Sequence, residues 1–301
     1  MNYPVIIFTY NRVSHVRTLI TSLLQCRSLS NRDIYIFSDG ASKKEEYEKV
    51  LKVRDYLLDV KKTNTDLSIK IIESKENKGL ANSIISGVTK IINEYEAAIV
   101  IEDDNIVSPF FLEYMDKMLQ FHRNDSRIFA IGAYSFPFKK PKGFQEKSFL
   151  SGRISSYAWG TWVENWNTID WEVAKYKKFK FNMKQRKEFN KYGNDRALML
   201  DKQKKGLINS WAIRFEFEMF LQSKYCVLPV ESLVKNTGND GSGTHSSEAN
   251  YEFDTTLTQA EYFELERLEV NDEIAYNFSK KYNYSVFRRF MVFIVRILLG
   301  L

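Results

Sequence analysis

The first 135 residues contain hydrophobic runs with two different spacings. Four short runs are almost continuously apolar, as in strands that are buried on both faces. Between them, apolar residues recur every three or four positions, which is the period of a helix with one buried face. The predicted strands are residues 4–10, 33–40, 67–74 and 97–104, and the predicted helices are residues 14–26, 42–60 and 79–95. This alternation predicts a largely parallel sheet covered by helices on both faces.

The pattern changes after Tyr134. All five tryptophans lie between Trp159 and Trp211, and residues 210–225 have the apolar pattern of a buried helix. An extended stretch follows, and then a loop rich in glycine and serine at residues 237–247. The chain shows no internal repeat and no clear linker. We therefore expect residues 1–135 and 136–272 to be two halves of one domain.

The last segment, residues 273–301, has a different character. From Ser285 onward it is apolar on most sides, with Arg289 and Arg296 on the same helical stripe as Ser285. Its apolar runs are too short for a transmembrane span, which needs ~20 residues. We predict an amphipathic helix that lies in the membrane interface. A helix that packs on the domain or on a second subunit is the alternative.

Composition narrows the class of protein. Two cysteines and three histidines predict neither a disulfide framework nor a zinc cluster. The chain begins directly with a strand-like run, so we expect a cytoplasmic protein, peripheral on the inner face of the cell membrane. The formal charge of +6 is uneven, because residues 172–191 carry +6 and residues 274–301 carry +5, which leaves −5 elsewhere. Two basic patches of this kind suit a membrane surface or a phosphate-bearing substrate better than a general nucleic-acid groove.

The candidate chemistry lies where the predicted strands end. Glu102, Asp103 and Asp104 follow the fourth strand directly, and adjacent carboxylates repel unless a cation or water screens them. The triplet is therefore either a divalent-metal site or an acidic turn before the next helix. Asp39 ends the second strand, either as a reader of a pyrimidine base or as part of an Asp-Gly turn. The loop at residues 77–79 precedes the third helix, so its free backbone N–H groups and Lys78 either face a phosphate or form an N-cap.

In this order, the motifs resemble those of a known family. PVIIFTYNR, FSDGAS, ENKGLANSI and AIVIEDDNIVSPFFLEYM are similar to the nucleotide-sugar half of GT-A-fold glycosyltransferases, of family two and the related N-acetylglucosaminyltransferase I group. YAWGTWVENW, NSWAIRFEFEMFL and LVKNTGNDGSGTH resemble blocks of bacterial polysaccharide-assembly transferases. The resemblance covers roughly residues 4–247. It implies an α/β GT-A fold with a donor-binding half at 1–135 and an acceptor-binding half at 136–272.

The resemblance also implies roles for single residues. Asp104 would be the direct ligand of Mn²⁺ or Mg²⁺ on the donor diphosphate, and His245 is a second candidate ligand. Hard divalent cations commonly use one or two carboxylates together with substrate phosphates. The remaining donor-binding candidates are Thr9, Asn11, Arg12, Asp39, Lys78, Glu102 and Asp103.

An inverting transfer also needs a carboxylate to take the proton of the acceptor hydroxyl. Similar enzymes have an Asp just before the SW block, where this chain has Asn209. Glu216 and Glu218 are the nearest alternatives, and they point about 200° apart on a helix, so at most one faces the site. Glu216 is the first choice, and its alternative role is that of a buried ion-pair partner for Arg214 or for another basic neighbour.

Trp159 and Trp162 flank Gly160 and are candidates for the acceptor-binding surface, because aromatic faces stack on sugar rings and glycine permits close approach. Core packing is the alternative.

Together these features predict a metal-dependent, inverting glycosyltransferase. It would transfer a sugar from a nucleoside diphosphate donor, with UDP favoured by the resemblance, to a hydroxyl of a glycan or lipid-linked glycan in surface polysaccharide synthesis. A sugar-nucleotide nucleotidyltransferase is a rival, although the first strand lacks the glycine-rich phosphate loop expected after it. A non-catalytic, membrane-associated glycan-binding relative is a rival of another class.

Overall fold

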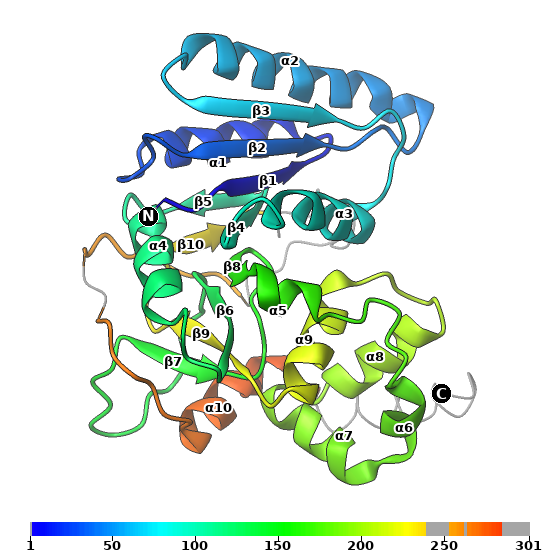
Figure 1. Cartoon of the computed structure of the whole chain (residues 1–301), viewed down its shortest axis with the longest axis vertical. Coiled ribbons are helices and arrows are strands. Elements are labelled where there is room, and N and C mark those ends of the chain that lie inside the picture. The colour runs from blue at the N-terminus through cyan, green and yellow to red at the C-terminus, as the bar shows by residue number, and fades with distance from the viewer. Residues whose placement is uncertain (1, 239–252, 262–263, 285–301) are drawn as a thin grey trace.

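The computed structural model describes residues 2–238, 253–261 and 264–284. Its main sheet has eight strands in the order β3-β2-β1-β4-β8-β6-β9-β7 (Figure 1). These strands are β1 (Val5–Thr9), β2 (Asp33–Ser38), β3 (Ser68–Glu73), β4 (Ala97–Glu102), β6 (Ile128–Gly132), β7 (Ser148–Ser151), β8 (Ala158–Trp162) and β9 (Tyr225–Pro229). A separate ribbon pairs β5 (Asn105–Val107) with β10 (Val234–Asn236).

The helices follow the predicted alternation in the first half of the chain. They are α1 (Val13–Leu24), α2 (Tyr47–Thr63), α3 (Leu80–Ile92), α4 (Phe111–Phe121), α5 (Val163–Asn167), α6 (Tyr176–Phe181), α7 (Met183–Phe189), α8 (Arg196–Lys204), α9 (Trp211–Leu221) and α10 (Asp272–Ser279). Three short 3₁₀ turns are η1 (Lys44–Glu46), η2 (Asn190–Tyr192) and η3 (Lys280–Tyr282). Each of the seven elements predicted in residues 4–104 has a counterpart in the structure.

The α/β architecture is confirmed, and the sheet is mixed. Strands β1 to β4 pair in parallel, whereas β8 runs antiparallel to both β4 and β6, and β7 runs antiparallel to β9. Because β4 pairs directly with β8, one sheet crosses the predicted boundary at residue 135. The two halves therefore share a hydrophobic core.

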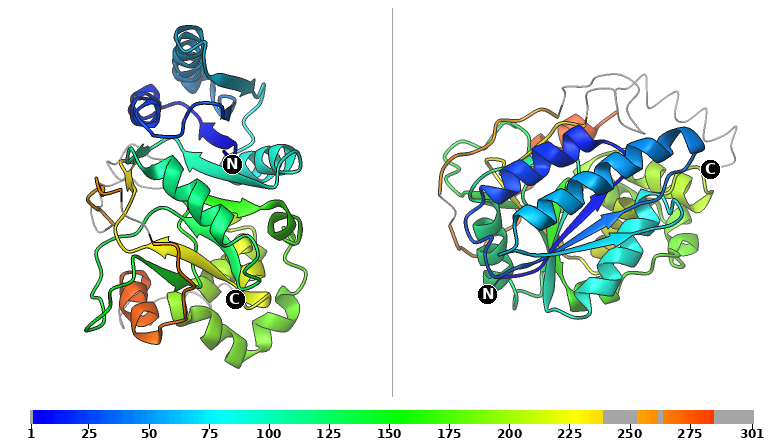
Figure 2. Two further views of the ribbon diagram at one scale, coloured as in Figure 1. Left: turned by 60° about the vertical axis from the view of Figure 1, so that its left-hand side comes forward. Right: turned by 90° about the horizontal axis from the view of Figure 1, so that it is seen from above.

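Helices cover both faces of this sheet. Helices α1, α2 and α4 lie on one face, while α3, α5 and α9 lie on the other (Figure 2). The apolar stripes read from the sequence explain this arrangement, since Val16, Leu19 and Ile20 of α1 are all buried. A second, smaller core lies among α6 to α9, and we call it the second aromatic core because half of its buried residues are aromatic.

The structure describes only part of the C-terminal segment predicted at residues 273–301. Helix α10 and η3 cover residues 272–282, whereas the predicted amphipathic helix from Ser285 to Leu301 lies outside the described residues. Among the helices that are described, none has the length and apolar character needed to cross a bilayer.

Candidate functional site

The acidic triplet lies at the carboxyl end of the central strand β4. Glu102 is its last residue, and Asp103 and Asp104 form the turn into β5. Strand β1 pairs in parallel with β4, with Phe8 opposite Glu102, so the residues after β1 come to the same edge. Ligands of open α/β sheets bind in the crevice outside the carboxyl ends of the strands.

Arg12 links the last two acids of the triplet. Its Nη2 lies 3.0 Å from Asp103 Oδ1 and 2.8 Å from Asp104 Oδ2. The backbone N–H of Tyr10 also donates to Asp103, with an N–O distance of 3.3 Å. A cation therefore already lies between the two carboxylates, and it offsets the repulsion that the sequence raised as a question.

Asp104 is held from a second direction by the β5–β10 ribbon. Asn236 Nδ2 donates to Asp104 Oδ1 at 2.7 Å, and the Thr237 N–H donates to the Asp104 carbonyl, also at 2.7 Å. The next residue is Gly238, where a Cβ would lie 2.0 Å from Asp104 Oδ2. Glycine is thus required for the chain to pass this close to the carboxylate. Neither Asn236 nor Thr237 was among the site residues predicted from the sequence.

Burial changes the ionisation of the triplet. The pKa of Glu102 lies well above its usual range because the carboxyl is buried and because Asp104 and Asp103 lie close by. Burial likewise raises the pKa of Asp103 to about 6, an effect that Arg12 partly offsets. Burial would lower the pKa of Arg12, but the neighbouring Asp103 and Asp104 outweigh it and raise that pKa.

The residues around Asp104 fit a hard divalent cation. Asp103 and Asp104 present oxygen donors, and Arg12 shows that positive charge is accommodated between them. The described residues contain no group of three or more acidic, histidine or cysteine side chains arranged around one ion. A bound metal would thus need further ligands, such as phosphate oxygens. His245, the second predicted ligand, lies outside the described residues.

Asp39 is tied to the loop that precedes α3. Its Oδ1 accepts from the N–H groups of Gly40 and Lys78, both at 2.9 Å, and its Oδ2 accepts from the N–H of Gly79 at 3.0 Å. Two of these N–H groups were predicted to be free for a phosphate, and that prediction is wrong, since the carboxylate takes them. The side chain of Lys78 is exposed.

Thr9 and Asn11 lie beside the triplet at the end of β1. Thr9 is buried, and its hydroxyl donates to the Phe37 carbonyl at 3.3 Å. Asn11 Nδ2 donates to Glu46 Oε1 at 3.2 Å, and the Tyr10 hydroxyl donates to the other oxygen of Glu46. Glu46, from η1, was not anticipated from the sequence.

The structure corrects the predicted acceptor surface. Trp159 and Trp162 are 0% and 2% exposed, so neither offers a face to a sugar. Trp159 stacks between Trp166 and Trp211, and the Trp162 indole N–H donates to the Leu119 carbonyl at 3.2 Å. Trp211 is also buried, at 3% exposed, but it lies against the acidic triplet, where a hydrogen bond from its indole lowers the pKa of Glu102.

Gly160 serves helix packing. A Cβ at this position would lie 3.0 Å from the Ala98 carbonyl oxygen and from side-chain atoms of Met115 and Leu119. Strand β8 therefore needs glycine where α4 crosses it. This is a correction to the prediction that the glycine admits a ligand.

Neither predicted general base faces the acidic triplet as a free carboxylate. Glu216 is buried and accepts from Arg196 Nε at 2.8 Å and from the Ile154 N–H at 3.2 Å. Glu218 is also buried and accepts from Gln222 Nε2 at 3.0 Å. The ion-pair alternative is the correct one for Glu216.

Asn209, at the position where similar enzymes have Asp, accepts from Arg214 Nη2 at 2.8 Å. Arg214 is therefore not the partner of Glu216.

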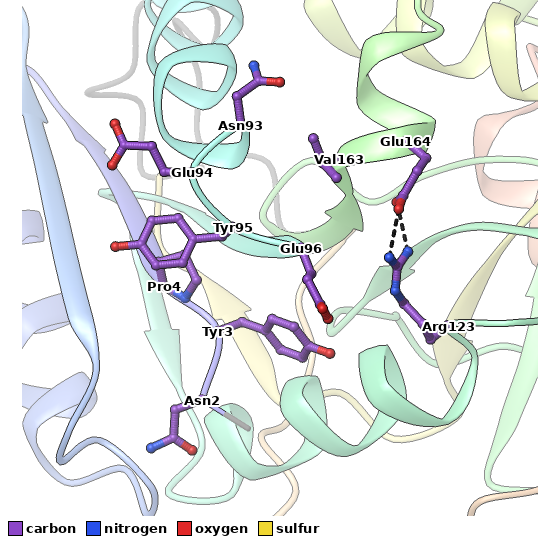
Figure 3. Close-up of a pocket in the computed structure, with 10 residues that line it drawn as sticks. All are labelled: Asn2, Tyr3, Pro4, Asn93, Glu94, Tyr95, Glu96, Arg123, Val163 and Glu164. Atoms are coloured by element: carbon purple, nitrogen blue, oxygen red, sulfur yellow. Dashed lines mark hydrogen bonds and ion pairs between the residues drawn. The ribbon is translucent and has the colours of Figure 1, made fainter.

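A separate cavity of about 410 Å³ lies at the opposite end of the strands from the acidic triplet (Figure 3). It is lined by residues that precede β1 and β4, including Tyr3 and Glu96, and by Arg123. Arg123 makes a two-point ion pair with Glu164, with N–O distances of 2.7 and 2.6 Å. This cavity is at the amino ends of the strands, away from the acidic triplet.

Comparison with known families gives a match over most of this fold. The profile described as glycosyl transferase family 2 matches residues 5–199, which is more than half of the chain and includes Arg12, Asp39 and the acidic triplet. The chain belongs to glycosyl transferase family 2. The predicted family is thereby confirmed, while the likeness to the N-acetylglucosaminyltransferase I group stays a prediction. A comparison with curated proteins found no match.

A comparison with solved structures gives matches that include two structures of TarS from S. aureus. The structure of TarS 1–349 is 12% identical and has a TM-score of 0.46, over 80% of this chain and 61% of TarS 1–349. The complex of TarS 1–349 with UDP is 11% identical, with a TM-score of 0.41 over 78% and 60% of the two chains. The bifunctional glycosyltransferase WbbM, without ligand, is 11% identical, with a TM-score of 0.35 over 56% and 32%. This family 2 chain thus spans less than two thirds of the length of these neighbours.

Proposed function

We propose that this family 2 protein is a metal-dependent, inverting glycosyltransferase. It takes a sugar from a nucleoside diphosphate donor, with UDP-sugars favoured, and attaches it to a hydroxyl of a glycan or lipid-linked glycan in surface polysaccharide synthesis. The observation that carries the proposal is the cluster at the carboxyl end of β4. There Asp103 and Asp104, two acids of one turn, share the guanidinium of Arg12.

The donor diphosphate suits this cluster because it is an anion that needs positive charge. Asp104 would hold Mn²⁺ or Mg²⁺, which neutralises the charge that develops on the leaving diphosphate. Arg12, released from the carboxylates, offers its guanidinium to a phosphate, for which its planar donors are well suited. Its Nη1 is buried without a hydrogen-bond partner among the described residues, so this group has donor capacity to spare.

The nucleoside is assigned to the neighbouring strand ends. Thr9, Asn11 and Asp39 end or follow β1 and β2, which pair in parallel and bring these residues to one edge. The three N–H groups bonded to Asp39 hold its carboxylate in a fixed orientation. The Lys78 N–H also lies 3.2 Å from Oδ2, so these bonds use about all four lone-pair directions of the carboxylate, and an N–H of a pyrimidine would have to displace one of them.

A thermal-shift panel tests this proposal. Nucleotides and sugar nucleotides are added to the full chain with and without Mn²⁺, and a ligand at a hundred times its Kd should stabilise the fold by about 2.7 kcal/mol. We expect one UDP-sugar to raise the melting temperature only with metal, and Asp104→Asn to abolish that rise. Asp66→Asn, at an exposed acid outside the site, is the matched control.

Two results would count against the proposal. The donor site fails if no sugar nucleotide shifts the melting temperature under any metal condition. The metal assignment fails if a UDP-sugar stabilises the protein equally in excess chelator. Transfer of the sugar to glycan acceptors is then measured with the donor that the panel identifies.

A further inference from the structure

The corner between α6 and α7 exposes two large apolar side chains next to each other. Phe181 ends α6 and is 79% exposed, and Met183 begins α7 and is 73% exposed. Among the large hydrophobic residues that the structure describes, these two have the highest exposed fractions. Neighbouring exposed apolar side chains of this size indicate an interaction surface.

Helices α6 and α7 are well packed on their inner faces, so the exposure of Phe181 and Met183 does not come from poor packing. The inner sides of α6 and α7 place Phe179 and Phe189 in the second aromatic core. Arg186 makes a two-point ion pair with the buried Asp201 of α8, at 2.8 and 2.7 Å. Between the two exposed residues, Asn182 caps α7 by accepting from the Gln185 N–H at 3.0 Å.

Lysines surround the two apolar side chains. Six of them occur within residues 175–187, and Glu188 is the only acid within residues 173–194. Within the described part of the chain, the only ion pair of these six is a 4.0 Å contact from Lys175 to Glu218. The six are Lys175, Lys177, Lys178, Lys180, Lys184 and Lys187.

We propose that this α6–α7 corner, residues 175–187, docks on the surface of an anionic lipid bilayer. Phe181 and Met183 would enter the boundary between headgroups and acyl chains, while the lysines contact the anionic headgroups. A basic surface with an apolar tip matches both parts of that interface. A nucleic acid or another soluble polyanion would use the lysines but would gain little from an exposed methionine.

The position of the corner in the fold suits this role. Figure 1 shows α6 and α7 on the side toward which β2 and β3 point, and far from α2 at the other end of the molecule. The acidic triplet lies at the carboxyl edge of the same sheet. Docking through the corner is separate from the predicted membrane helix at residues 285–301.

Vesicle flotation with the full chain tests the corner directly. The probes are vesicles of phosphatidylcholine alone and of phosphatidylcholine with 30% phosphatidylglycerol. We expect binding to the anionic vesicles only, and a loss in 0.5 M NaCl. Each lysine near the surface contributes about 1 kcal/mol, or about fivefold in affinity, so Lys177→Gln/Lys178→Gln/Lys184→Gln should weaken binding about a hundredfold. Phe181→Ser/Met183→Ser should weaken it at least tenfold.

The control variants are Lys61→Gln/Lys62→Gln and Tyr47→Ser, at exposed positions of α2. They should bind as the wild type does, while all variants keep its melting temperature, because only exposed side chains change. Absence of binding by the full chain overturns the proposal. So does full binding by Phe181→Ser/Met183→Ser, because the two apolar side chains would then contribute nothing to vesicle binding.

Discussion

Replacing Glu216 by Gln distinguishes the two roles of this residue: the general base predicted from the sequence, and the ion-pair partner of Arg196 seen in the structure. As a general base, the carboxylate should be needed for turnover and not for stability. In the structure it is the partner of Arg196, which is 1% exposed, and its second oxygen accepts from the Ile154 N–H. Arg153 lies 3.9 Å away and is itself paired with Asp195.

The size of the effect follows from this charge balance. Arg153, Arg196, Asp195 and Glu216 form a neutral buried group, and Glu216→Gln leaves it with one uncompensated positive charge. Removing one partner of a buried pair typically costs 3–5 kcal/mol. Gln has nearly the same volume, so no cavity adds to this figure. For a chain of this size we expect the melting temperature to fall by about 5–8 °C.

Urea unfolding measures this change, and Glu218→Gln on the same helix is the control. Glu218 accepts from Gln222, and its nearest cation is the exposed Lys175 at 4.0 Å, so its replacement should cost about 1 kcal/mol or less. An unchanged unfolding midpoint for Glu216→Gln, together with a loss of transfer of 10²-fold or more, would refute the structural role and restore the base assignment.

Three further changes have outcomes that the structure sets. Asp39→Asn should lower the unfolding free energy by about 1–3 kcal/mol in a urea titration, because the Gly79 N–H loses its acceptor. Gly160→Ala should lower the free energy of unfolding by about 1–3 kcal/mol, because the new Cβ would lie against the Ala98 carbonyl. An unchanged urea midpoint would show that α4 can shift without cost. Burial lowers the pKa of His122 to about 4 in the folded protein, whereas a histidine in the unfolded chain titrates near 6.5. The unfolded chain therefore binds the proton more readily, and the protein loses stability as the pH falls from about 6.5 toward 4. His122→Leu should therefore lose less stability than the wild type between pH 7 and pH 4.5.

Sequence reasoning was most successful where the signal is local. The strands and helices of the first half came from the spacing of apolar residues within single segments, and the acidic triplet followed from its place after a strand. Parallel pairing of β1 and β4 then brings Arg12 to the triplet, as the rule for strand ends implies.

It failed where a role depends on a distant partner. The pattern around Trp159, Gly160 and Trp162 is the same whether a strand faces a ligand or a packed helix. Only the position of α4 and the stacking of Trp211 on Trp159 distinguish the two.

By itself, the sequence determined the order of strands and helices in the first half of the chain, the family, and the end of the sheet where an acidic site would form. Those features depend on residues within one segment or on a general rule of parallel sheets. The tertiary structure decided that Asn236 and Thr237 hold Asp104, that Trp211 reaches Glu102, and that Glu216 belongs to Arg196. Each is a contact between segments far apart in the chain, and no periodicity within either segment specifies which side chains will meet.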